Sequence, residues 1–339
     1  MIRESLELFT LFLASQTSNA LPYWPYKQYN LPDSRKSYLL QILTRQNYPS
    51  TNETKVSAQS DHNEVSEIHE GSKVRETGEA KEIREAKEIK SAKKFGRPAV
   101  PILNYHWVVP ENHPNAFQRY YQTKGQLRNT IENMKKKGYN FITVSELERL
   151  ISDYDSTKLD TTKYALLTFD DGLECFYKNA YPILLEENVK ATLFVTTVCI
   201  DDSVSGPYLS WKQIKEMYES GLIDVQSHTH NSHVITGKNE SLVTSMKRGE
   251  DSLTYCLRIF ADFLKSRWEI EEHVGNKVIA LAWPFGLSNA VARKMASLAG
   301  FKLYFNVNGE SFKFGKEYRD LPRIEVGELE KTTKVQNQK

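Results

Sequence analysis

The sequence has few cysteines and no apolar run long enough to cross a membrane. Its three cysteines lie far apart, so they form neither a disulfide framework nor a CxxC metal knuckle. The apolar stretch at residues 8–14 is shorter than the roughly 20 residues that span a bilayer. The formal net charge is only +2, so the charge balance gives no reason to expect nucleic acid as a partner.

Aromatic residues are missing between residues 50 and 94, where Glu, Lys, Ser and Thr dominate. Such a composition cannot bury enough apolar surface to fold. The segment Glu79–Ile83 recurs as Glu85–Ile89, which is typical of a solvated, partly helical spacer. We therefore expect a disordered or partly helical charged linker over residues 21–97.

The first 20 residues carry a weak export pattern. The apolar stretch follows Arg3 and precedes the small residues Ser18–Ala20, as in a signal peptide, but two glutamates interrupt the positive region. We expect residues 1–20 to be a signal or membrane-associating segment, with an incidental helix as the alternative. A polar tail is expected at residues 329–339.

Residues 98–328 alternate between strand-like and helix-like patterns. Short apolar runs predict strands at 100–105, 140–144, 164–169, 191–198, 222–226, 278–283, 302–307 and 321–326. Amphipathic stretches predict helices at 127–137, 145–151, 173–187, 210–220, 242–268 and 289–298. This order favours a parallel α/β sheet closed into a distorted (β/α) barrel. An open doubly wound sheet is the alternative, although no Gly-rich phosphate loop supports it.

Polar and aromatic residues lie at the carboxyl ends of several predicted strands, the rim where barrels of this type assemble their active sites. The residues in these positions are His106, Asp170, Asp171, His228, Pro284, Phe285 and Arg323.

Two adjacent carboxylates, Asp170 and Asp171, end the apolar run at 164–169. Neighbouring buried anions repel each other, so a cation is the simplest group to compensate them. Successive strand side chains point to opposite sides, so one carboxylate can ligate a metal while the other faces an attacking water. Gly172 then lets the chain turn away. An Asp-Asp-Gly turn that caps the next helix is the alternative.

Three of the eight histidines lie within Ser227–His233, again after an apolar run. Neutral imidazole is the commonest ligand of zinc-like ions. Four residues separate His228 from His233, so a loop can bring both onto one ion. His230 is expected to be solvent-exposed or to lie behind the ligands, and a polar loop without a metal is the alternative for the whole segment.

These segments resemble the polysaccharide deacetylase family, carbohydrate esterase family 4. The resemblance rests on Leu-Thr-Phe-Asp-Asp-Gly at 167–172, the run at 191–195 and the histidine segment at 227–233. A narrower resemblance is to the poly-β-1,6-N-acetyl-D-glucosamine N-deacetylases of biofilm exopolysaccharide systems. It rests on the histidine spacing and on Asn104–His106, Asn179–Leu184 and Ala282–Gly286. The similarity covers residues 98–326.

The resemblance implies a distorted (β/α) barrel of the NodB-like type and a role for each site residue. Asp170 would be the general base. Asp171, His228 and His233 would hold a divalent metal, with zinc as the first choice and cobalt, nickel or iron as alternatives. Water activated at the metal would attack the acetamide carbonyl, and a backbone N–H near Phe285 would help to hold the oxyanion.

Two features of the family are missing from the chain. The arginine usually found three residues before the Pro-aromatic motif is absent at Leu281 or its neighbour, and no histidine follows His273 to act as a late acid. The subgroup implies His106 as the substitute acid, with a structural strand-end histidine as the alternative. Arg323 either partners Asp170 in place of the missing arginine or forms a plain surface salt bridge.

Aromatic side chains near the expected site are candidates for stacking on sugar rings, whose C–H faces suit π-systems. The substrate-binding candidates are Tyr105, Trp211, Trp283 and Phe285, with Tyr208 as a further one and Pro284 in support. For each aromatic residue a place in the core is the alternative.

The function that the resemblance implies is a metal-dependent N-deacetylase of an N-acetylglucosamine polymer, acting in biofilm formation outside or on the surface of a bacterial cell. Peptidoglycan, chitin and acetylated xylan are the alternative substrates. A non-catalytic carbohydrate-binding protein and a metal-binding scaffold are the alternatives from other classes.

Overall fold

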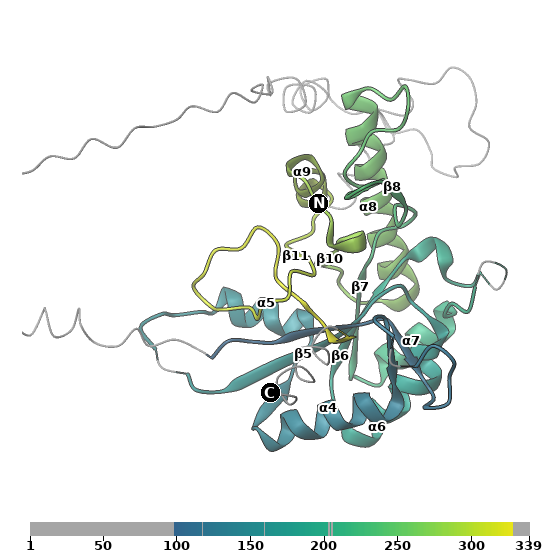
Figure 1. Cartoon of the computed structure of the whole chain (residues 1–339). Coiled ribbons are helices and arrows are strands. Elements are labelled where there is room, and N and C mark those ends of the chain that lie inside the picture. The colour runs from purple at the N-terminus through teal and green to yellow at the C-terminus, as the bar shows by residue number, and fades with distance from the viewer. Residues whose placement is uncertain (1–97, 117, 159, 203, 205, 328–339) are drawn as a thin grey trace, which may run out of the picture. The chain divides into compact units, whose positions relative to one another are not determined.

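The computed structural model describes residues 98–327 except 117, 159, 203 and 205. The segments expected at 1–20, 21–97 and 329–339 therefore lie outside the described residues, whereas the expected domain is described almost completely (Figure 1).

A parallel sheet forms the centre of the domain. Its strands are β1 (Ile102–Tyr105), β4 (Tyr139–Phe141), β5 (Lys163–Phe169), β6 (Ala191–Val195), β7 (Ile223–Ser227), β10 (Ala280–Ala282), β11 (Leu303–Phe305) and β12 (Ile324–Glu325). They are arranged in the order β11-β10-β7-β6-β5-β1-β12, with β4 also paired to β5. A parallel bridge connects Phe305 of β11 to Leu321, in the segment that leads into β12, and so brings the two ends of this path together. The sheet is thus the distorted (β/α) barrel expected from the sequence, and the open sheet is excluded.

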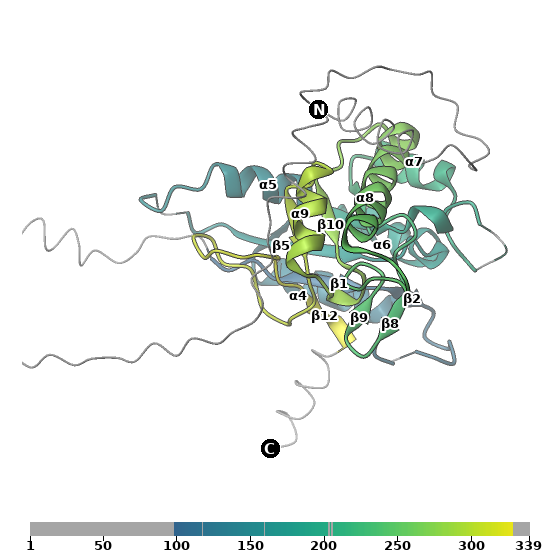
Figure 2. The same ribbon diagram turned by 90° about the horizontal axis from the view of Figure 1, so that it is seen from above.

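Helices lie around the outside of these strands (Figure 1). They are α4 (Lys124–Lys136), α6 (Tyr181–Glu187), α7 (Trp211–Glu219), α8 (Ser252–Val274) and α9 (Ala290–Leu298), with the short turns η1 (Phe176–Ala180), η2 (Thr197–Cys199) and η3 (Pro284–Gly286). Helix α5 (Val144–Ser152) instead packs its Leu147 into the interior cluster. Helices α8 and α9 pack against each other (Figure 2). No helix within the described part of the chain has the length and hydropathy of a membrane span.

Local side-chain chemistry determines where three of the helices begin. Thr123, Thr143 and Ser210 each accept a hydrogen bond from the third residue of the following helix, whose Gln or Glu side chain accepts one in return. Such reciprocal capping boxes satisfy two backbone donors that the first helical turn leaves without partners. The sequence therefore fixes the starts of α4, α5 and α7 locally, before any packing is considered.

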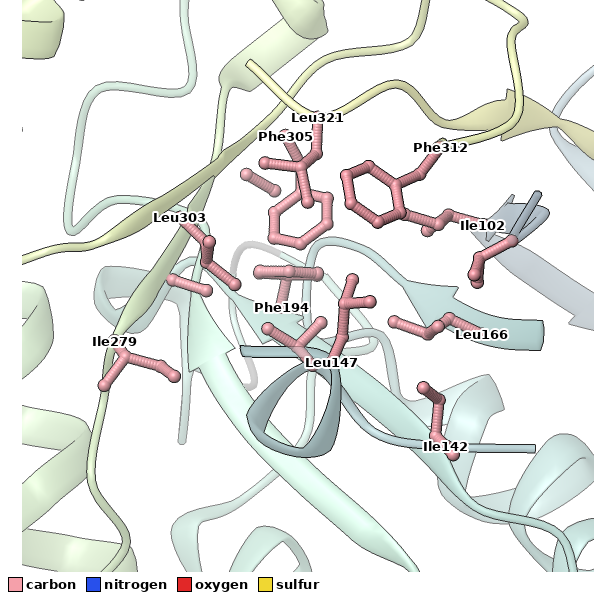
Figure 3. Close-up of a cluster of buried hydrophobic side chains, with 14 residues drawn as sticks. Ile102, Ile142, Leu147, Leu166, Phe194, Ile279, Leu303, Phe305, Phe312 and Leu321 are labelled. Carbon is pink, nitrogen blue, oxygen red and sulfur yellow. The ribbon is translucent and has the colours of Figure 1, made fainter. Parts of the chain in front are cut away.

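The interior of the barrel is filled by apolar side chains from successive strands. Figure 3 shows Leu166, Phe194 and Phe305 within this cluster, and the rings of Phe194 and Phe305 have centroids 5.4 Å apart. All three side chains are fully buried. Since buried aromatic and branched side chains contribute the largest area removed from water, this cluster holds the strands at fixed positions beneath the rim.

The predicted elements agree with the structure except in four places. All eight predicted strands are present, but the helix predicted at 242–268 begins at Ser252 and ends at Val274. Arg323 precedes the two-residue strand β12 rather than following a longer one. The prediction missed the short pair β2 (Trp107–Val109) and β3 (Tyr121–Thr123). It also missed the hairpin β8 (Ile235–Gly237) and β9 (Glu240–Ser241).

Candidate active site

Asp171, His228 and His233 converge at the carboxyl ends of β5 and β7. Each offers one ligand atom, and these atoms lie within 4.8 Å of one another. Oδ1 of Asp171 is 3.6 Å from Nε2 of His228 and 3.3 Å from Nδ1 of His233. The three residues that the sequence proposed as metal ligands therefore form one cluster.

The backbone around this cluster is held in an uncommon conformation. Asp171, Thr229 and Phe285 have positive φ angles of 76°, 77° and 58° without being glycine. Such conformations cost about 1–3 kcal/mol each and persist only where the surroundings enforce them. Gly172 also has a positive φ, where a side chain is strained, and a Cβ there would lie 2.9 Å from Cδ1 of Ile200.

Both histidines are neutral, as metal binding requires, and a hydrogen bond orients His228. Nδ1 of His228 lies 2.9 Å from the carbonyl oxygen of Ala282, which turns Nε2 toward Asp171. Burial is the largest influence on both rings and lowers the pKa of His228 and of His233 to about 4. Both imidazoles are therefore uncharged at neutral pH and have a lone pair available for a cation.

The cluster fits a divalent metal ion. Oδ1 of Asp171 is buried and has no hydrogen-bond partner, although burial of an unpaired carboxylate oxygen is costly. One carboxylate and two imidazoles are a ligand set that zinc accepts, and cobalt, nickel and iron accept it as well. The donor set thus explains the unpaired oxygen without distinguishing among these metals.

Asp170 is paired with Arg323. Nη1 and Nη2 of Arg323 donate to Oδ1 and Oδ2 of Asp170 at 2.7 and 2.8 Å, and Arg323 is fully buried. Burial on its own raises the pKa of Asp170, but the guanidinium charge, with smaller contributions from His228 and His106, holds the pKa well below its usual range. Of the two alternatives for Arg323, the structure excludes a surface salt bridge.

His106 faces a buried carboxylate that the sequence analysis missed. Its Nδ1 lies 3.6 Å from Oε1 of Glu325. Burial lowers the pKa of His106, but Glu325 and the charges of Asp171 and Asp170 outweigh it and raise the pKa to about 9. The imidazole is therefore protonated at neutral pH and can donate a proton.

Asn104 connects the partners of these two groups. Its Oδ1 accepts from Arg323 at 2.8 Å, and its Nδ2 donates to Oε2 of Glu325 at 3.4 Å. Arg323 directly precedes β12 and Glu325 lies on it, while Asn104 lies on β1 and His106 directly follows it; Asn104 and Glu325 are register partners in the β1–β12 pair. The only sequence signal for Glu325 was this two-residue spacing from Arg323.

A pocket opens beside the Asp171, His228 and His233 cluster. Asp171 and His233 form part of its wall, together with Val198, Tyr208 and Asn231. This wall combines an aliphatic side chain, an aromatic ring and an amide next to the ligand cluster. Tyr208, a further candidate for substrate contact, is therefore adjacent to the site.

The structure corrects two of the four predicted substrate contacts. Trp283 is fully buried and Tyr105 is 1% exposed, so neither can present a ring face to a sugar. Nε1 of Trp283 donates to Asp320 at 2.8 Å, which gives this ring a structural role beside Pro284. Periodicity could not reveal this, because a strand-end aromatic residue looks the same whether it faces the core or the solvent.

The other two predicted contacts differ from each other. Phe285 is 42% exposed and its ring centroid lies 4.5 Å from that of His233, so it borders the metal cluster. Trp211 stacks on His273 of α8 with centroids 4.4 Å apart. Trp211 is not among the residues that line the pocket, and its substrate contact stays a prediction.

A parallel (β/α) barrel with an Asp-His-His cluster, a carboxylate paired with arginine and an imidazole facing a carboxylate at its rim indicates a hydrolase. Comparison with known proteins points to one family. Residues 158–304 match the family model of polysaccharide deacetylases.

Individual relatives support the same family. The chain is 27% identical over 248 residues to a poly-β-1,6-N-acetyl-D-glucosamine N-deacetylase of Staphylococcus aureus, covering 69% of this chain and 81% of that protein. The fold of this chain is similar to that of the de-N-acetylase of Aggregatibacter actinomycetemcomitans (TM-score 0.59, 24% identity, covering 67% of this chain and 95% of that one). IcaB from Ammonifex degensii is also similar (TM-score 0.56, 24% identity, 67% and 91%).

Proposed function

We propose that this protein is a metal-dependent N-deacetylase that removes acetyl groups from N-acetylglucosamine residues of poly-β-1,6-N-acetyl-D-glucosamine. The observation that carries the proposal is the convergence of three functions on one rim. The Asp171, His228 and His233 cluster lies beside an ionised carboxylate, Asp170, and a protonated imidazole, His106.

Each side chain has a role in amide hydrolysis. A bound divalent cation would polarise the acetamide carbonyl and lower the pKa of water. Asp170, kept ionised by Arg323, accepts a proton from the attacking water. Because both carboxylate oxygens are already oriented by the guanidinium, the free lone pairs of Asp170 have fixed directions.

The leaving amine needs a proton, because an amide nitrogen leaves poorly as an anion. His106 is protonated at neutral pH and supplies it. The backbone N–H of Phe285 is the candidate donor to the oxyanion, since the N–H of Gly286 is already donated to the carbonyl oxygen of Trp283 at 2.9 Å.

The choice of polymer rests on relatives rather than on the site. The S. aureus relative carries the name of a poly-β-1,6-N-acetyl-D-glucosamine N-deacetylase, and it resembles this chain over most of its length. The proposed organisation has a deacetylase domain at 98–328, a charged linker at 21–97 and a signal or membrane-associating segment at 1–20. We place the protein outside or on the surface of a bacterial cell, where biofilm polymer is accessible.

Acetate release from purified polymers tests the proposal. The protein loaded with zinc should release acetate from the β-1,6 polymer faster than from chitin oligomers, peptidoglycan or acetylated xylan. Asp170→Asn serves as the inactive reference. Acetate release from only one of the other polymers would support the deacetylase chemistry but refute the proposed substrate. No acetate release from any polymer would refute the proposed function.

A further inference from the structure

The loop that carries the two histidine ligands is held by helix α8, which supplies no ligand itself. Helix α8 faces this loop with Asp262, Ser266 and Glu269. Their spacing of four and three residues places these side chains on one face of the helix. Each of them contacts a different part of the segment between Ser227 and Asn231.

Asp262 holds the backbone between the ligands. Its Oδ2 accepts from the N–H of His230 at 2.9 Å, and its Oδ1 accepts from the N–H of Asn231 at 2.7 Å. Each carboxylate oxygen therefore fixes one of two consecutive peptide groups. Both peptides lie between His228 and His233, so their orientation sets the direction from which the second ligand approaches.

Ser266 supports the strained residue that follows the first ligand. Thr229 has a φ of 77°, and its N–H donates to Oγ of Ser227 at 3.1 Å. Oγ of Ser227 lies 2.7 Å from Oγ of Ser266, which donates to the carbonyl oxygen of Phe263 at 2.9 Å. Because Ser266 uses its own proton for Phe263, Ser227 donates to Ser266, and the chain of hydrogen bonds continues into the helix.

Glu269 holds the side chain of His230, the histidine that the sequence left without a ligand role. Nδ1 of His230 lies 3.0 Å from Oε2 of Glu269, which also accepts from the hydroxyl of Thr197. On the opposite side of the loop, the N–H groups of Thr197 and Val198 donate to the carbonyl oxygens of Thr229 and His230. The loop is thus fixed between η2 and α8.

We propose that Asp262, Ser266 and Glu269 are positioning residues that hold the His228–His233 loop in its metal-binding conformation. Groups behind the ligands orient them in advance, and their loss generally lowers metal affinity about 10–100-fold. The inference rests on the metal site of the proposed function but does not depend on the polymer or on acetate release.

Metal titration and hydrogen exchange of the full chain test the inference. Asp262→Asn keeps the shape but offers only one acceptor to two N–H groups. It should weaken zinc binding about tenfold or more in calorimetric titration of the metal-free protein. The amides of His230 and Asn231 should exchange faster in the same metal-free variant, a change that activity measurements do not report.

Two further variants and a control complete the test. Ser266→Ala and Glu269→Ala should also weaken zinc binding, and Glu269→Gln should weaken it less because its amide oxygen still accepts. Glu272→Gln, an exposed change on the same helix, should leave the zinc affinity unchanged. If Asp262→Asn does not fold, the Ser266 and Glu269 variants still test the positioning role.

The outcomes separate this inference from the proposed function. Unchanged zinc affinity and unchanged amide exchange in a folded Asp262→Asn variant would overturn the positioning role, whatever the enzyme's activity. Conversely, tight zinc binding that depends on these residues, without acetate release from any polymer, would support the positioning role and refute the deacetylase.

Discussion

At the scale of single residues, Asp170 depends on one guanidinium for its charge. Arg323 approaches it with two hydrogen bonds in a fully buried setting, and paired charges in such a setting are costly to separate. The same pairing that keeps the carboxylate ionised also makes it a weak base. Its usefulness in catalysis therefore lies in position as much as in basicity.

Asp170→Asn should lower kcat about 10²–10⁴-fold, the usual contribution of a positioned general base. It should also lower the stability, because Arg323 then keeps a buried charge without its counter-ion. Steady-state acetate release and thermal unfolding measure the two effects. The exposed change Asp153→Asn is the matched control, and near-normal kcat in Asp170→Asn would remove Asp170 from the mechanism.

Glu325→Gln should move the alkaline limit of activity to lower pH. In the proposed mechanism His106 donates its proton only while it is charged, so activity should be present below its pKa of about 9 and lost above it. Replacement of the Glu325 carboxylate weakens the hydrogen bond that is the strongest influence raising this pKa, and it also removes the smaller effect of the Glu325 charge. The pH profile of kcat/KM reports the change, and an unmoved alkaline limb would show that another group donates the proton.

At the scale of elements, the turn η3 is held from behind by Trp283. The indole donates to Asp320, which also accepts from Ser288 and Arg293. The turn places Phe285 against His233 and keeps Gly286 at a φ of 70°, where a Cβ would lie 2.5 Å from Val307. A partly buried network around the indole thus determines where the exposed phenyl ring lies.

Trp283→Ala should destabilise the protein by about 3–5 kcal/mol, as other buried tryptophans do. Trp283→Phe keeps most of the buried area but loses the bond to Asp320, so its effect should be smaller. Urea unfolding gives both values. A raised KM with unchanged stability would instead restore Trp283 as a sugar-binding residue.

The sequence predicted the strands well because buried parallel strands are continuous apolar runs. The prediction failed where tertiary contacts determine the boundaries of an element. The helix predicted from residue 242 begins at Ser252, because the preceding residues form β9 and a turn, and Asp251 caps the helix through the N–H of Thr254. The hairpin of β8 and β9 was missed because its strands are too short to show alternation.

The site was predictable to the extent that its residues follow strands. Asp171, His228 and His233 could be grouped because the carboxyl ends of parallel strands share one rim. Glu325 could not be assigned to the site, because its contact with His106 is made from a strand more than 200 residues away in the chain. The burial of Trp283 and Tyr105 was equally invisible to periodicity.

At the scale of the whole molecule, metal removal should lower thermal stability. A ligand that binds only the folded state stabilises it by RT ln(1 + [L]/Kd), about 4 kcal/mol at a thousandfold excess over Kd. Chelation should therefore lower Tm, and zinc should restore it. The variant His233→Ala, which loses one ligand, should show little response to either treatment; an equal response would place the metal elsewhere.

The barrel is completed by its last described strand, and this has a consequence for synthesis. Arg323 and Glu325 both belong to the final described segment of the domain, yet they contact Asp170 and His106, the proposed base and acid. A nascent chain that already contains both aspartates and every histidine of the centre still lacks its electrostatic partners until that segment leaves the ribosome. Under the proposed mechanism, the order of synthesis therefore leaves the site without these two partners until the domain is whole.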